Sequence, residues 1–171
     1  MKNLTKQLAK QYPYKKSNVM GAIEIQGGYM VWIRDIDTKM YRFYNSGEEY
    51  EKMKEESENF SLDDFISYNT DSMKFYVDSI DEEIENLENG NPSERYFRFE
   101  RNRFTNYFDK DCYVLVYHDD AKQNSVTLDE MKKVREFFLF CIEAMTKRCT
   151  TWWKKYGASK LKWVFQEKMW K

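Results

Sequence analysis

The strongest constraint on the fold is a long apolar stripe with helical spacing near the C-terminus. Thr127 and Glu130 stand three residues apart, the spacing of a capping box that opens a helix. Apolar side chains then recur every three or four residues, at Met131, Val134, Phe138, Cys141, Met145, Cys149, Trp152 and Tyr156. Gly157 has the position of a C-cap. The sequence predicts one long helix over 127–156, with its middle in the core, and a final strand over Leu161–Phe165.

The N-terminal part has the pattern of a short helix followed by an antiparallel sheet. Leu4–Tyr12 is amphipathic and is ended by Pro13. Runs of β-branched and aromatic residues follow, separated by a glycine pair and a polar break, at Val19–Ile25, Tyr29–Arg34 and Met40–Tyr44. These runs predict a three-stranded meander.

The middle of the chain alternates helix and strand signals. Ser46 and Ser61 are each followed by acidic residues, as in helix N-termini, and predict two short helices. From Asp71 the apolar spacing predicts a further amphipathic helix with an acidic outer face. Tyr96–Glu100 and Cys112–Tyr117 are predicted strands.

These elements predict a single α+β domain over 1–171, in which an antiparallel sheet packs against the long C-terminal helix and shorter acidic helices. A chain of 171 residues with 2 Pro and 6 Gly offers no linker. It has no apolar run of the roughly 18 residues that a membrane span needs. It also lacks a secretory signal and a Cys-x-x-Cys pair, so we expect a cytoplasmic protein with reduced thiols, in a host cell if it is phage-encoded.

The charge is distributed unevenly behind a net value of −1. Residues 1–20 contain five Lys and no acid, whereas residues 46–94 contain sixteen acids and three Lys. Residues 147–171 contain eight bases, one acid and four Trp. The acidic segment is expected to repel nucleic acid and attract basic proteins, unless it is only a solubilising surface or is neutralised by the basic C-terminal end.

Catalytic signatures are absent from the sequence. It has no Gly-x-Ser-x-Gly elbow and no phosphate-binding loop, and any triad would depend on the one histidine, His118. His118 and Asp120 follow a predicted strand and would be the ligands of a divalent-metal-dependent enzyme, which is the third functional hypothesis. A binding protein without a cofactor is favoured over an enzyme.

A short, Lys-, Glu-, Asn- and Tyr-rich chain with a dense acidic segment, from Ser46-Gly47-Glu48-Glu49 to Asp81-Glu82-Glu83, resembles small phage and mobile-element accessory proteins, including anti-CRISPR inhibitors. The resemblance lies in composition and charge layout. It implies inhibition of a nucleic-acid-handling enzyme, such as a CRISPR effector, by carboxylates that imitate phosphates. The expected partner-binding residues are Glu48, Glu49, Glu51, Glu55, Glu56, Asp81, Glu82, Glu83 and Glu85.

The alternative hypothesis is direct nucleic-acid binding by the basic, Trp-rich C-terminal region, in which lysines neutralise phosphates and indoles stack on bases. Its residues would be Lys147, Arg148, Lys154, Lys155, Lys160, Lys162, Trp153 and Trp163. The aromatic content of 18% is more than one core usually needs. It leaves room for an exposed aromatic patch that serves a partner or a homodimer.

Overall fold

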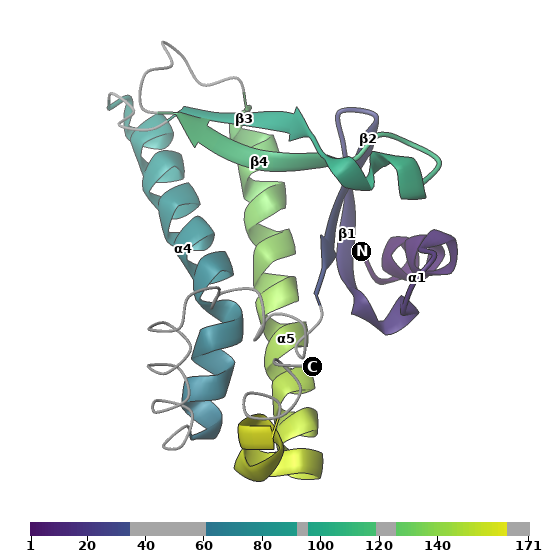
Figure 1. The fold of residues 1–171 in the computed structure, drawn as a ribbon. Helices are drawn as coiled ribbons and strands as arrows, with labels where there is room; N and C mark the ends of the chain where they lie inside the picture. The colour runs from purple at the N-terminus through teal and green to yellow at the C-terminus, as the bar shows by residue number, and fades with distance from the viewer. Residues whose placement is uncertain (35–60, 92–95, 119–125, 164–171) are drawn as a thin grey trace. The chain divides into compact units, whose positions relative to one another are not determined.

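The computed structural model describes residues 1–34, 61–91, 96–118 and 126–163 (Figure 1). Within these residues the fold is α+β, with three α-helices and two two-stranded antiparallel sheets. The chain divides into two compact units, one formed by Met1–Ile33 with Met73–Ile142 and the other by Arg34–Ser72 with Glu143–Lys171. Among the described residues, no helix is both long and apolar enough to cross a membrane.

The first unit opens with the predicted short helix and hairpin. Helix α1 (Lys2–Gln11) ends before Pro13 and buries Leu8. Strands β1 (Val19–Ile25) and β2 (Gly28–Ile33) pair antiparallel. Both turn residues between them have positive φ, as a two-residue type I′ hairpin loop requires. The third strand of the predicted meander, at 40–44, lies outside the described residues.

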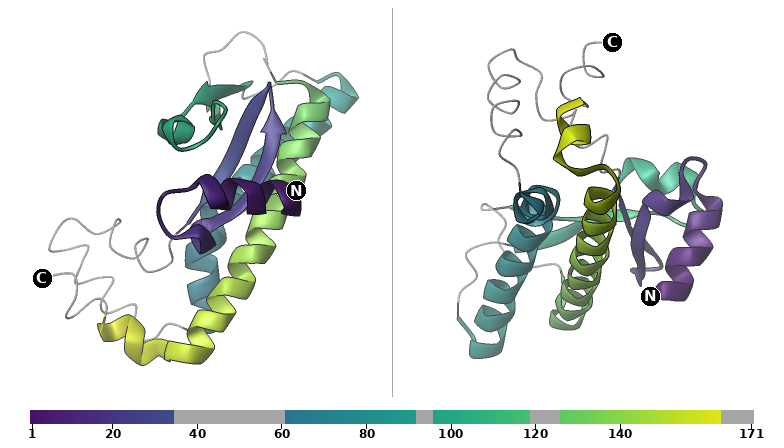
Figure 2. Two further views of the ribbon diagram at one scale, coloured as in Figure 1. Left: turned by 90° about the vertical axis from the view of Figure 1, so that its right-hand side faces the viewer. Right: turned by 90° about the horizontal axis from the view of Figure 1, so that it is seen from below.

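A bulge lets the β1–β2 hairpin bury both faces. The register shifts between Val19 and Gly21, so that Val19 and Ala22 point to the same side despite their odd spacing. That side packs on α1, which lies across the hairpin (Figure 2). On the other side, a Cβ at Gly21 would lie 2.8 Å from Sγ of Cys141. The long C-terminal helix therefore contacts the hairpin closely here.

The second hairpin confirms the two strands expected in the middle of the chain and supplies their pairing. Strand β3 (Tyr96–Arg101) runs antiparallel to β4 (Tyr113–His118), and the 3₁₀ helix η2 (Arg103–Tyr107) lies in the connection. The two hairpins meet where the backbone N–H of Tyr29 donates to the carbonyl of Asp111 at 2.8 Å. A Cβ on the preceding Gly28 would lie 2.3 Å from that oxygen, so glycine is needed at this junction.

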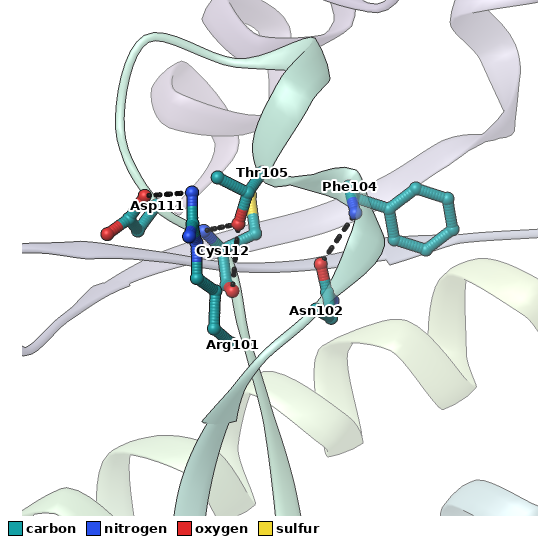
Figure 3. Close-up of polar contacts among 6 residues, drawn as sticks. All are labelled: Arg101, Asn102, Phe104, Thr105, Asp111 and Cys112. Carbon is teal, nitrogen blue, oxygen red and sulfur yellow. Dashed lines mark hydrogen bonds and ion pairs between the residues drawn. The ribbon is translucent and has the colours of Figure 1, made fainter.

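Polar side chains hold the connection that carries η2 (Figure 3). Oγ1 of Thr105 accepts from the backbone N–H of Cys112 at 3.0 Å and donates to its carbonyl at 3.4 Å. The side-chain oxygen of Asn102 accepts from the N–H of Phe104 at 2.8 Å and caps η2. Cys112 is fully buried, and this burial, with a smaller contribution from Asp111, raises the pKa of its thiol to about 11.

Helix α4 (Leu62–Asn89) is one continuous helix, so the prediction of a separate short helix at Ser61 and a second helix from Asp71 is wrong. Ser61 does cap it, since its hydroxyl accepts from the N–H of Asp64 at 3.2 Å. Asn69 and Thr70 are poor helix formers, yet their side chains donate to carbonyls four residues back, at 2.9 Å and 2.8 Å. These bonds keep them within the helix instead of ending it.

Helix α5 (Leu128–Trp163) starts at the predicted capping box, where Thr127 accepts from the N–H of Glu130 at 3.1 Å. The predicted stripe is buried from Met131 through Cys149. Beyond it, Trp152 is half-buried and its ring lies 5.0 Å from the fully buried Phe65. Tyr156 is exposed, so the prediction is wrong at that position.

The predicted C-cap at Gly157 is also wrong, because α5 continues to Trp163. The strand predicted over Leu161–Phe165 is wrong for the same reason at 161–163, and residues 164 and 165 lie outside the described residues. A glycine inside a helix costs only about 1 kcal/mol. The helix-forming Ala158, Lys160 and Leu161 follow it and extend the helix.

Candidate functional site

The outer face of α4 presents a row of exposed carboxylates. Asp78, Glu82 and Glu85 are exposed and form no ion pair with any residue that the structure describes. With 3.6 residues per turn, these positions and Phe75 fall within an arc of about 80°. Phe75 is 48% exposed, which is unusual for so large an apolar side chain. We call Phe75, Asp78, Glu82 and Glu85 the acidic α4 face.

The carboxylates at the inner edge of α4 are neutralised by α5. Asp81 forms an ion pair with Arg135, and Glu88 pairs with Lys132 at 2.9 Å. The two pairs run in opposite chain directions, so these parts of α4 and α5 lie side by side and antiparallel (Figure 1). Asp81 was predicted to bind a partner, but its carboxylate is already engaged within the protein.

Glu83 was also predicted to be a partner contact, but it is 3% exposed. On the α4 helix it lies toward the buried side that carries Met73, Val77 and Ile80. It is therefore not available to a partner on the surface. Consecutive residues of a helix point in different directions, so the three acids at 81–83 cannot all lie on one face. The other predicted acids, Glu48, Glu49, Glu51, Glu55 and Glu56, lie outside the described residues.

The predicted basic residues near the C-terminus all lie on α5, and several are already occupied. Lys147 pairs with Glu143 at 3.1 Å, and Arg148 donates to the carbonyl of Arg34 at 3.1 Å. The Trp153 ring lies 5.5 Å from Phe65, which is fully buried.

The remaining residues of the alternative site are less engaged. Lys154 and Lys155 are exposed, and Lys155 lies 5.1 Å from the ring of Tyr156. Lys160, Lys162 and Trp163 belong to the helix, but their side chains lie outside the description.

The residues proposed for metal-dependent catalysis lie at the end of β4 and outside the described residues. His118 is the last residue of β4, its side chain is outside the description, and so is Asp120. Where the chain is described, no group of three or more His, Cys, Asp or Glu side chains is placed to hold a metal ion.

A hollow of about 580 Å³ lies between α1, β1 and α5, but Lys133 at its edge already donates to the carbonyl of Glu24 at 2.6 Å.

An aromatic cluster at the end of α1 was missed by the sequence analysis. Tyr14 is 64% exposed, and its ring lies edge-on to Tyr12 at 5.6 Å and to Tyr107 of η2 at 5.9 Å. Phe108 stacks on Tyr12 at 6.3 Å. The run Tyr-Pro-Tyr-Lys-Lys over 12–16 was the available signal, but nothing local places Tyr107 beside it.

The chain matches no protein-family model, no curated protein and no solved structure.

Proposed function

We propose that this protein is a non-enzymatic binding protein that inhibits a nucleic-acid-handling enzyme, with a CRISPR effector as one example. The acidic α4 face would occupy a basic groove on that partner. The proposal rests on one observation: Asp78, Glu82 and Glu85 are exposed on one side of α4 and are left unpaired by the described residues, whereas the neighbouring Asp81 and Glu88 are paired.

The spacing of these carboxylates supports imitation of a phosphate backbone. At 1.5 Å of rise per residue, they recur on average about every 5 Å along the helix axis. Phosphates on one strand of DNA recur about every 3.4 Å, which is of the same order. Lys and Arg side chains that line a nucleic-acid groove could therefore engage them from one side.

Phe75 adds a contact that charge alone would not give. It lies one turn before Asp78 on the same face and is half exposed. Aromatic side chains are enriched among the residues that dominate binding energy, while the surrounding charges set the rate of association. We expect fast, salt-sensitive binding with Phe75 as an anchor.

The test uses a panel of purified nucleic-acid-handling enzymes, each assayed for binding to labelled nucleic acid while this protein is titrated in. For an inhibited enzyme, the triple variant Asp78→Asn, Glu82→Gln, Glu85→Gln should raise the concentration needed for inhibition by about tenfold or more, because each lost charged contact contributes on the order of 1 kcal/mol or more.

A matched control removes three acids that already have basic partners, in the variant Glu100→Gln, Asp111→Asn, Glu143→Gln. It has the same net charge as the α4 variant and should inhibit like the wild type. Equal weakening by the two variants would mean that net charge, and not the acidic α4 face, drives association. Full inhibition by the α4 variant would refute the proposal.

A further inference from the structure

The end of α1 combines exposed aromatic rings with lysines. Tyr14 is anchored between Tyr12 and Tyr107 by two edge-on ring contacts, yet most of its surface remains exposed. A ring fixed in this way loses little conformational freedom when something stacks on it. It is a pre-formed platform instead of a loose surface side chain.

Three exposed lysines lie within four residues of Tyr14 in the sequence. Lys10 ends α1, and Lys15 and Lys16 directly follow Tyr14; all three are exposed. None of them forms an ion pair with a residue that the structure describes. We call Tyr12, Tyr14, Tyr107, Lys10, Lys15 and Lys16 the tyrosine–lysine patch.

The acids on β1 and on the β3–β4 connection form no ion pair with these lysines in the described part of the chain, and each has another contact. Asp111 pairs with Arg101 at 3.4 Å, and Glu24 pairs with Lys110 at 3.9 Å. Asp109 accepts a hydrogen bond from the hydroxyl of Tyr29 at 3.0 Å. Lys2 and Lys6 extend the positive charge along the outward side of α1.

We infer that the tyrosine–lysine patch binds single-stranded nucleic acid. Bases would stack on Tyr14, and Lys10, Lys15 and Lys16 would neutralise adjacent phosphates, which is how strand-binding surfaces combine rings and cations. The patch shares no residue with the acidic α4 face, so this inference stands or fails apart from the proposed function.

The test is fluorescence anisotropy of a short labelled oligo(dT) with the full-length protein, between about 50 and 200 mM salt. The wild type should bind at the lower salt and weaken as salt rises. Tyr14→Ala should lower the affinity about fivefold or more, whereas Tyr14→Phe, which keeps the ring, should bind like the wild type. Because Tyr14 is exposed, circular dichroism should show an unchanged fold.

The lysines are tested by the slope of log affinity against log salt. Neutralising all three in Lys10→Gln, Lys15→Gln, Lys16→Gln should reduce that slope by about 2, because each phosphate contact on a single strand contributes about 0.7. The comparison variant Lys154→Gln, Lys155→Gln removes two exposed lysines of the alternative site on α5 and should leave binding unchanged, which separates the two candidate sites.

Three results would overturn the inference. The first is absence of oligonucleotide binding at low salt. The second is binding that Tyr14→Ala leaves intact, or that only the Lys154, Lys155 variant reduces. The third is co-sedimentation with phosphatidylserine vesicles without oligonucleotide binding, which would assign the patch to an anionic membrane surface.

Discussion

The acidic α4 face and the tyrosine–lysine patch are both charged surfaces of the first unit, but they are organised differently. On α4, Asp81 at the inner edge forms an ion pair with Arg135. On the outer face, Asp78, Glu82 and Glu85 are exposed and form no ion pair with a described residue. In the tyrosine–lysine patch none of the lysines forms an ion pair with a described residue, and the Tyr14 ring contacts Tyr107 from a distant segment.

This difference indicates what each surface is suited to contact. Carboxylates with one aromatic anchor fit a folded basic partner, whereas lysines beside a held ring fit a flexible strand with stacking bases. The near-neutral net charge of −1 therefore conceals two surfaces of opposite charge.

The largest expected effect is on the free energy of unfolding and comes from Phe138, which packs against both β2 and α4. The Phe138 ring lies 5.7 Å from Trp32 of β2 and 5.6 Å from Tyr76 of α4. Phe138→Ala should lower the free energy of unfolding by about 3–5 kcal/mol, because it leaves a cavity against both elements. Urea denaturation followed by circular dichroism measures this loss.

Across the denaturation transition of this variant, the two proposed binding activities should be lost in parallel, and Phe138→Leu should lower the free energy of unfolding by less. If only one activity were lost, the acidic α4 face and the tyrosine–lysine patch would belong to parts of the protein that unfold separately.

An effect of intermediate size on the free energy of unfolding is expected at alkaline pH. It arises from Cys112 and Tyr29, at the junction of the two hairpins. Burial raises the pKa of the Cys112 thiol from 9.0 to about 11, and burial followed by the hydrogen bond to Asp109 raises the pKa of Tyr29. Both groups are almost entirely neutral in either state below about pH 8. Above it the unfolded chain releases protons first, so the free energy of unfolding should fall.

For Cys112 this fall should reach up to about 1 kcal/mol per pH unit and level off as the pH passes about 11. Denaturation curves for the wild type and Cys112→Ala across this window measure the effect, and the variant should lose stability less steeply. Parallel curves would show that the thiol does not stay protonated in the folded state.

The smallest expected effect concerns the ion pair at the inner edge of α4. Arg135→Gln releases Asp81 from its ion pair and should lower the free energy of unfolding by no more than about 1 kcal/mol, because the pair is partly exposed. The freed carboxylate should strengthen binding to a basic partner a few-fold. Lys110→Gln, which breaks the pair with Glu24, should leave that binding unchanged. Weaker binding by Arg135→Gln would show that Arg135 itself contributes to the contact.

Local sequence determined where α4 and α5 begin, and it predicted the four strands β1 to β4. The capping residues Ser61 and Thr127 start α4 and α5 as expected, because a cap requires only residues within one turn. The buried stripe of α5 through Cys149 was likewise readable, because one helix face has a fixed period. The same local reasoning failed at Gly157, where the residues that follow decide whether a helix continues.

Tertiary structure alone decided which charges and rings are available. The sequence gives Asp81, Glu82 and Glu83 the same chemistry, yet the structure pairs the first, exposes the second and buries the third. It also brings Tyr107 to Tyr14 through the junction of two hairpins. Such contacts join residues far apart in the chain, and neither periodicity nor composition records them.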